Sequence, residues 1–313
     1  MTIPSVDLSD FLSNDINLKA SFVSQLGNAY EDVGFVAVKN HGISSELITA
    51  LYKNAQEFFS LPSDQKKLFE IKDLAGQRGY TSFGKEHAKG SIAPDLKEFF
   101  QYGQIARDSF TEEHYPDNVI VAQLEDFNNV FNNAYRAFEK SGTHLLQAIA
   151  LYLGLDEFYF DKYIYNGNSI LRSIHYPPIT SEPASAIRAE QHEDINLITL
   201  LVGASADGLQ ILTKTNEWVG VTSLPDQIVV NVGDMLQRLT NNKLKSTTHR
   251  VVNPSRDLWH TSRFSIPFFL HPKSSMSLRC IDSCVTEIAP IHYDDISAGD
   301  YLNERLIEIG LKK

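Results

Sequence analysis

The feature that most constrains the fold is a change in the chain after about residue 168. From there on, short apolar runs are separated by Gly, Asn, Asp and Pro residues. Each run has the length of one strand and is closed by turn-forming residues, which is typical of an all-β sandwich or barrel. The runs cover residues 169–175, 195–202, 209–213, 218–221, 228–232, 248–252 and 263–270. We therefore expect a β core in this half of the chain.

The first half of the chain predicts mixed α and β structure. Residues 34–38 form a β-branched and aromatic run that ends in a turn, and residues 44–59 show helical spacing with Ser44 or Ser45 as N-cap. Apolar residues recur every three or four positions over 125–153, which predicts a long helix with a break near Ser141-Gly142. The expected plan is an N-terminal region (1–120), a long supporting helix (121–165), a β core (166–275) and a C-terminal extension (276–313).

Composition narrows the class of partner. The formal charge of -11, without a basic cluster, disfavours nucleic acid and favours a small-molecule substrate. Cys280 and Cys284 form neither a disulfide framework nor a four-ligand zinc pattern, which fits a reducing compartment. We expect a cytoplasmic protein without a membrane partner, because no signal peptide and no run of about 18 apolar residues is visible. The oligomeric state is left open.

A possible metal site lies within the β half. His192 and Asp194 are two residues apart, and in an extended strand such residues point to the same face, with Glu193 facing the other way. His249, 55 residues beyond Asp194, opens another β-branched run and is the candidate third ligand. Two imidazoles and one carboxylate leave positions open on an octahedral ion, which suits oxygen activation at Fe(II) better than structural zinc. No catalytic side chain beyond the metal ligands is expected.

An anion site is predicted on the last run of the β half. Arg263 and Ser265 share one strand face among apolar neighbours, and a buried arginine requires an anionic partner. A bound carboxylate would provide one, with the serine hydroxyl as a further donor. Tyr176, at the end of another run, could donate its phenol hydroxyl to the same group.

Each of these features also has a simpler interpretation. With ten histidines in the chain, a His-x-Asp pair arises easily by chance, and a single His249 is more often a core residue. Arg263 could form a structural ion pair, and Tyr176 could pack on the prolines that follow it. Their occurrence together is what favours a metal and carboxylate site.

Nearly the whole chain resembles the isopenicillin N synthase-like family of 2-oxoglutarate- and Fe(II)-dependent oxygenases. The similarity rests on ordered motifs at both ends of the chain. They are Ile3-Pro4-Ser5-Val6-Asp7-Leu8, Gly34-Phe35 through Asn40-His41-Gly42, Gln56 through Pro62, Asp95-Leu96-Lys97-Glu98, Asn231-Val232-Gly233-Asp234, and Thr240 through Ser246.

The resemblance implies a double-stranded β-helix (jelly-roll) core with flanking helices. It implies that His192, Asp194 and His249 bind Fe(II), and that Arg263 and Ser265, helped by Tyr176, bind the far carboxylate of 2-oxoglutarate. With O2, such an enzyme would release succinate and CO2 and hydroxylate a C–H bond of a small molecule, with desaturation or ring closure as variants. One departure is Ile174, where many plant members have an Asn that contacts the co-substrate.

Substrate contacts are the least constrained part of the prediction. The candidates are Phe99, Gln101, Ile211, Phe268 and Leu270, although residues of these types in such positions are more often core residues than substrate contacts.

Two other functions stay open at this point. An isopenicillin N synthase-like Fe(II) oxidase would act without 2-oxoglutarate and use the Arg-x-Ser pair for the substrate's own carboxylate. A non-catalytic β-barrel binding protein would have the fold without turnover, although the complete His-Asp-His set argues against it. Dependence of turnover on 2-oxoglutarate distinguishes the expected oxygenase from the first alternative. Stoichiometric Fe(II) binding distinguishes it from the second.

Overall fold

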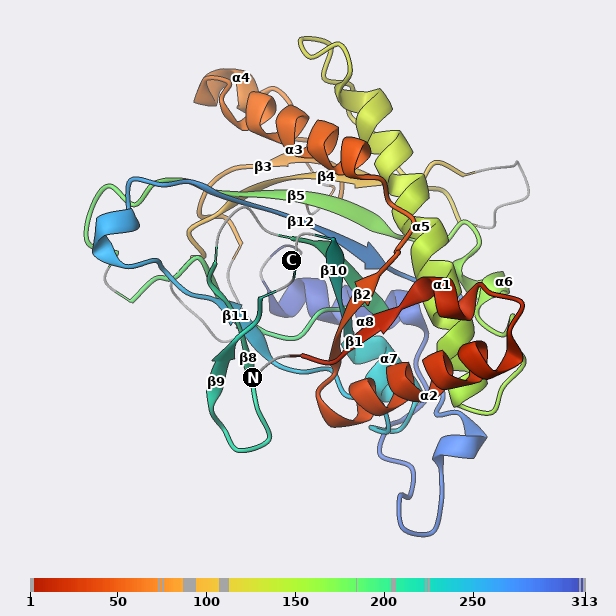
Figure 1. Ribbon diagram of the computed structural model, residues 1–313. Helices are drawn as coiled ribbons and strands as arrows, with labels where there is room; N and C mark the ends of the chain where they lie inside the picture. The colour runs from red at the N-terminus through yellow and green to blue at the C-terminus, as the bar shows by residue number, and fades with distance from the viewer. Residues whose placement is uncertain are drawn as a thin grey trace.

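Two β-sheets form the centre of the molecule in the computed structural model, which describes residues 3–72, 74, 76–86, 94–106, 113–183, 185–203, 207–222, 224, 226–309 and 311. The large sheet has eight strands in the order β1-β2-β10-β7-β12-β5-β4-β3, and the small sheet has four in the order β6-β11-β8-β9. Figure 1 shows the two sheets on opposite sides of the interior, with helices α3, α4 and α5 outside the large one.

The strands are β1 (Ser5–Asp7), β2 (Phe35–Lys39), β3 (Gly79–Thr81), β4 (Glu98–Gly103), β5 (Ile170–Tyr176), β6 (Ala189–His192), β7 (Ile198–Val202), β8 (Leu209–Leu212), β9 (Trp218–Gly220), β10 (Gln227–Val232), β11 (His249–Val251) and β12 (Arg263–Leu270). The α-helices are α1 (Leu8–Phe11), α2 (Ile16–Asp32), α3 (Ser45–Phe59), α4 (Ser63–Lys67), α5 (Phe127–Tyr152), α6 (Asp161–Ile164), α7 (Asp234–Leu239) and α8 (Ala298–Glu308). Short 3-10 helices cover Arg256–Leu258 and Asp282–Cys284.

Strands β5 to β12 form a double-stranded β-helix, as the sequence predicts. Strands β5, β7, β10 and β12 lie in the large sheet, whereas β6, β8, β9 and β11 form the small one. Most neighbours within the β-helix are not consecutive strands, because the chain passes back and forth between the two layers; β12, for example, pairs with both β5 and β7. The β8–β9 hairpin is an exception. The arrangement closes a jelly roll around an interior cavity.

The N-terminal strands extend the large sheet at both edges. Strands β1 and β2 add next to β10, and β3 and β4 add next to β5. The N-terminal region therefore shares one sheet with the β core and depends on it for pairing. The residue boundaries proposed for the four regions of the chain remain a prediction.

Helix α5 is the main support of the outer face of the large sheet. Its buried stripe includes Phe131, Phe138 and Leu145, and the helix packs against β12, β5 and β4. The predicted break near Ser141-Gly142 is wrong, since α5 is continuous there. Gly142 instead allows close packing, because a Cβ at this position would lie 2.3 Å from Leu270 Cδ1.

Helix α8 closes one end of the cavity between the sheets. It begins after Ser297, whose side chain accepts a hydrogen bond from Asp300 N, and Tyr301, Arg305 and Leu306 line the cavity. Figure 1 shows α8 within the outline of the barrel. Among the described helices, none combines the length and apolarity needed to cross a membrane.

Candidate metal centre and its cavity

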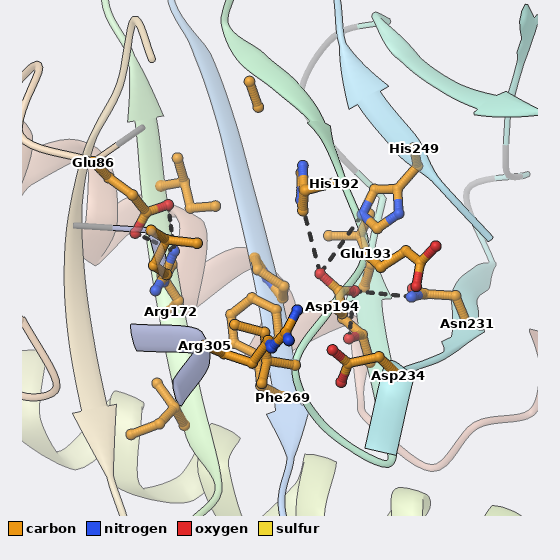
Figure 2. A pocket seen from close by; sticks show the side chains of 18 of the residues that line it. Glu86, Arg172, His192, Glu193, Asp194, Asn231, Asp234, His249, Phe269 and Arg305 are labelled. Atoms are coloured by element: carbon orange, nitrogen blue, oxygen red, sulfur yellow. Dashed lines mark hydrogen bonds and ion pairs between the residues drawn. The ribbon is translucent and has the colours of Figure 1, made fainter. Parts of the chain in front are cut away.

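Three predicted ligands meet at the inner face of the small sheet. One ligand atom from each of His192, Asp194 and His249 lies within 4.8 Å of the others. His192 ends β6 and His249 begins β11, and the two residues are direct cross-strand partners. Directly opposite residues of an antiparallel pair share a face, which explains why the two imidazoles lie 4.4 Å apart between ring centroids. Figure 2 shows the three side chains converging.

Asp194 reaches the site by a route that the sequence did not predict. Strand β6 ends at His192, so the two ligands are not alternate residues of one extended strand. The chain turns after His192, and Asp234 N at the start of α7 donates a hydrogen bond to Asp194 O (2.8 Å). Glu193 also lines the cavity and accepts a hydrogen bond from Thr248 Oγ1 (3.3 Å), so the expectation that it faces away from both ligands is wrong.

Hydrogen bonds orient all three ligands. The Nδ1 atoms lie near backbone carbonyls, at 2.6 Å from Glu190 O for His192 and 3.1 Å from Thr247 O for His249. The Nε2 atoms therefore point toward Asp194 Oδ1, at 3.8 Å for His192 and 3.6 Å for His249. Such carbonyl contacts fix the tautomer and ring orientation of metal-binding histidines.

The second oxygen of Asp194 is held by two neighbours on the large sheet. Thr199 Oγ1 donates to Asp194 Oδ2 at 2.6 Å, and Asn231 Nδ2 donates at 2.8 Å. Thr199 and Asn231 are cross-strand partners on β7 and β10. The two donors leave Oδ1 directed toward the histidines, which is the orientation a metal ligand needs.

The protonation states also suit a divalent cation. Burial and the nearby His249 lower the pKa of His192 to about 4, so its imidazole is neutral at pH 7. Burial alone would raise the pKa of Asp194, but His249, His192 and the hydrogen bonds from Asn231 and Thr199 hold it below its usual value. A neutral imidazole and an ionised carboxylate are the forms in which these side chains bind metal, and a set of two histidines and one carboxylate fits Fe(II).

The predicted carboxylate-binding residues lie together on the inner face of the large sheet. Arg263 on β12 is the cross-strand partner of Tyr176 on β5, and Ser265 is the partner of Ile174. All four side chains are buried and line the same cavity as the metal ligands. The Arg263 guanidinium carbon lies 5.1 Å from the Tyr176 ring centroid. The strand alternation predicted for Arg263 and Ser265 is confirmed.

The cavity has a volume of about 650 Å³ and lies between the two sheets. A cross-strand row of Phe35, Asn231, Thr199 and Phe269 crosses the large sheet and faces it. His271, two residues after Phe269, continues the same face, and burial lowers its pKa to about 4.

Opposite the metal ligands, the cavity wall is made of paired charges. Arg172 Nη1 lies 3.1 Å from Glu86 Oε2, and its Nε donates to Gln101 Oε1 at 2.9 Å. Lys97 Nζ lies 2.7 Å from Glu86 and 2.8 Å from Asp95. Burial alone would raise the pKa of Glu86, but Arg172 and Lys97 lower it to about 2. In Figure 2 the Glu86–Arg172 pair lies across the cavity from the metal ligands. We call Glu86, Asp95, Lys97, Gln101 and Arg172 the polar wall.

The predicted substrate residues differ in whether their side chains line the cavity. Gln101 lines the cavity as part of the polar wall. Phe99 lies beneath that wall, with the Arg172 guanidinium 4.2 Å from its ring centroid. Ile211 is the backbone partner of His249 but packs in a buried cluster with Phe35.

Phe268 and Leu270 are corrected by the structure. Phe268 stacks on Phe138, and Leu270 packs against Gly142, so both contact α5 on the outer face of the sheet. The cause is the two-residue period of β12, in which residues of the same parity as Arg263 face the cavity. If the alternation that places Arg263 and Ser265 on one face is continued along the strand, it brings Phe269 to the cavity as well. The sequence-based prediction missed Phe269.

Other cavity residues carried weaker signals in the sequence. Thr199 and Asn231 lie in predicted strands, but only the register between those strands brings them to Asp194. Arg172 and Glu86 are 86 residues apart, and their pairing depends on tertiary structure.

Comparison with known proteins agrees with this geometry. Residues 3–123 match the model of the "non-haem dioxygenase in morphine synthesis N-terminal" family, and residues 167–272 match that of the 2OG-Fe(II) oxygenase superfamily. A proline hydroxylase of Petromyces alliaceus is 31% identical over 98% of this chain and 99% of its own length. The chain belongs to the 2OG-Fe(II) oxygenase superfamily.

Solved structures show the same likeness. A 2OG-Fe(II) oxygenase family protein from Caulobacter crescentus is 38% identical, covers 98% of this chain and 99% of its own, and has a TM-score of 0.87. A Neurospora crassa protein, solved with alpha-KG (2-oxoglutarate) and thymine, is 30% identical over 97% of this chain and 96% of its own, with a TM-score of 0.85.

The protein is therefore a 2-oxoglutarate- and Fe(II)-dependent dioxygenase, with O2 as co-substrate. Its relatives do not favour the alternative that works without 2-oxoglutarate, because they are named for the co-substrate or were solved with it. The complete His-Asp-His set likewise disfavours a non-catalytic binding protein.

Proposed function

We propose that His192, Asp194 and His249 hold the Fe(II) of this oxygenase, and that Arg263, Ser265 and Tyr176 hold the far carboxylate of 2-oxoglutarate. The observation that carries the proposal is the convergence of the three ligand atoms within 4.8 Å at the wall of the cavity that Arg263 and Ser265 also line. Iron bound there supplies the oxygen activation that hydroxylation of a C–H bond requires.

The protein's own residues orient and enclose the reactants. Thr199 and Asn231 fix one oxygen of Asp194, so the other stays directed at the metal position. Arg263 presents a planar fork that matches a carboxylate, and Ser265 adds a hydroxyl donor on the same strand face. The sheets on both sides and α8 at one end limit the access of water.

The co-substrate assignment is tested by binding and by product release. Fe(II) and then 2-oxoglutarate are added without oxygen, and a visible charge-transfer band is followed before oxygen is admitted and succinate is measured. We expect the band to need both additions, and slow succinate release to follow oxygen. If iron binds and 2-oxoglutarate then changes neither signal, the assignment is wrong.

Arg263→Met tests the far-carboxylate site in particular. The expected result is a rise in the KM for 2-oxoglutarate of roughly 100-fold, since a buried charge-assisted contact is lost. Arg256→Met is the matched control, because Arg256 is an exposed arginine at the protein surface. Equal KM values for the two variants would contradict the role of Arg263.

We also propose that the substrate is small, uncharged and rich in hydrogen-bonding groups, with a planar nitrogen heterocycle as the favoured class. The polar wall supports this, because its two carboxylates and two cations are paired with one another and leave both acceptors and donors at the cavity. Phe269 offers a ring face beside it, 5.3 Å from the Arg172 guanidinium. The Neurospora crassa relative, which binds thymine and 5-formyluracil in solved structures, supports the same class.

A substrate panel tests this class. Succinate release is measured with pyrimidines and purines and, as the alternative from the Petromyces relative, with proline. We expect a heterocycle to stimulate succinate release and the Arg172→Met variant to lose this stimulation. The slow succinate release that occurs without substrate should be unchanged in the variant. Stimulation by proline alone would contradict the proposal. A cytoplasmic location is part of the same proposal and is tested by fractionation.

A further inference from the structure

Arg188 is a buried cation that the proposed chemistry does not use. It directly precedes β6, the strand that carries His192, and its side chain is only 2% exposed. Its Nη2 atom donates to Thr261 O at 3.0 Å, and its Nε atom has no hydrogen-bond partner among the described residues. A buried guanidinium with so little compensation is costly to the fold.

The neighbours of Arg188 are those of the proposed carboxylate site. Its guanidinium lies 5.9 Å from the Tyr176 ring centroid, and that of Arg263 lies 5.1 Å from the same ring. Thr261, which accepts its hydrogen bond, is two residues before Arg263. Two buried arginines therefore lie next to one tyrosine beside the cavity.

Within the described part of the chain, no carboxylate compensates Arg188. Burial and then Arg263 lower the pKa of Arg188 to about 10, and the phenol of Tyr176 acts weakly in the other direction. The guanidinium still carries its charge at pH 7. Its charge adds to that of Arg263 beside the ring of Tyr176, and a carboxylate bound there would be attracted by both cations.

We propose that Arg188 is a positioning residue for the co-substrate, and that its charge, next to Tyr176, strengthens the binding of the far carboxylate of 2-oxoglutarate at Arg263. Arg188 is not among the cavity-lining residues. It therefore acts on the co-substrate through Tyr176 and through the electrostatic field of its charge, and not by direct contact. This inference rests on the proposed co-substrate site and adds a second cation to it.

Binding measurements on the Fe(II)-loaded protein without oxygen test the role of the charge. The dissociation constant is measured by calorimetry for 2-oxoglutarate and for 2-oxopentanoate, which has the same 2-oxo acid group and chain length but no far carboxylate. Arg188→Gln keeps a donor for Thr261 O and removes the charge. We expect it to weaken 2-oxoglutarate roughly tenfold or more and to leave 2-oxopentanoate within about twofold.

Arg188→Lys is the conservative variant and should restore most of the affinity, to within about threefold of the unmodified protein, because the charge is kept. Equal weakening of both ligands by Arg188→Gln, equal loss in the Gln and Lys variants, or no change at all would overturn the inference. Each of these results would mean that Arg188 supports the fold and not the far carboxylate.

Arg263→Met, measured in parallel, separates this inference from the proposed function. If Arg263→Met weakens 2-oxoglutarate and Arg188→Gln does not, only the role of Arg188 fails. If Arg263→Met has no effect, or the unmodified protein shows no preference for 2-oxoglutarate over 2-oxopentanoate, the co-substrate site is wrong and the inference fails with it.

Discussion

At the scale of single residues, the site depends on how each ligand is held as much as on which residues are present. Asp194 illustrates this, because one of its oxygens accepts two hydrogen bonds while the other faces both histidines. A carboxylate without those donors could rotate between several orientations. The donors therefore reduce the conformational freedom that metal binding would otherwise have to remove.

Thr199→Val tests that role with a change of nearly constant volume. Loss of the hydroxyl should weaken Fe(II) binding roughly 10- to 100-fold while the fold is kept, because Asp194 loses its shortest donor. Iron affinity by competition with a chelating dye is the measurement, and Asp194→Ala should remove binding altogether. Thr213→Val, in the β8–β9 hairpin, is the matched control. Unchanged affinity in Thr199→Val would contradict the role of the hydroxyl.

Glu86→Gln tests the polar wall through the pH dependence of stability. The folded protein lowers the pKa of Glu86 from 4.5 to about 2, so its ion pairs contribute on the order of 3 kcal/mol above pH 4.5. That contribution is lost as the pH falls from about 4.5 to about 2, because the unfolded chain takes up the proton first. We expect the variant to be less stable at pH 7 by this amount and equal to the unmodified protein near pH 2.

Denaturant unfolding at a series of pH values measures this difference. Glu57→Gln is the control, since its pair with Lys53 is exposed and at 3.9 Å. A stability gap for Glu86→Gln that persisted at pH 2 would show that the carboxylate charge is not its cause.

At the scale of elements, the start of α7 and the turn after β6 form one unit. Gly233 N donates to Leu197 O, and Met235 N donates to Asn196 O, so the first turn of the helix binds the segment that carries Asp194. A Cβ on Gly233 would lie 2.3 Å from Asn196 O. Only glycine permits this approach of two backbones.

Gly233→Ala should therefore disturb both stability and iron binding. We expect a loss of at least about 2 kcal/mol in the free energy of unfolding, because backbone and not a flexible side chain must move. Iron affinity should fall as well, since the displaced turn positions Asp194. Gly220→Ala on β9 has open space around its Cβ and should change neither quantity. Equal behaviour of the two variants would show that the turn tolerates displacement.

At the scale of the whole molecule, the last element of the chain completes the cavity that the first half helps to build. Strand β4 and the residues before it supply most of the polar wall, and Arg172 on β5 completes it. Strands β5 to β12 and the turns between them supply the metal and co-substrate residues, and α8 closes one end. Tyr301 on α8 donates to Asp234 Oδ2 at 2.9 Å, which fixes the helix to α7. Binding of substrate thus depends on segments from the entire chain.

Removal of residues 297–313 tests that arrangement. The jelly roll should remain folded and bind Fe(II) and 2-oxoglutarate, because their residues lie on the sheets. Substrate-stimulated succinate release should fall roughly 100-fold or more, since the open cavity no longer positions the substrate. Tyr301→Phe, which removes one hydrogen bond, should have a smaller effect. Full stimulated activity in the truncated protein would exclude α8 from the substrate site.

The sequence by itself determined those features that local periodicity encodes. Alternation of apolar residues and turns predicted the strands of the β core, three-to-four spacing predicted α5, and the Arg263-Ser265 spacing predicted a shared strand face. Metal-binding residue types are few, so His192, Asp194 and His249 could be recognised together. These properties depend on neighbours along the chain.

The tertiary structure alone decided how those parts combine. It placed Asp194 in a turn beyond β6, brought Glu86 to Arg172 across 86 residues, and turned Phe268 toward α5 while Phe269 faces the cavity. It also placed Arg188 next to Tyr176. Register between strands and contacts between distant segments set each of these, because many pairings satisfy the same local pattern and only close packing of the whole chain selects one.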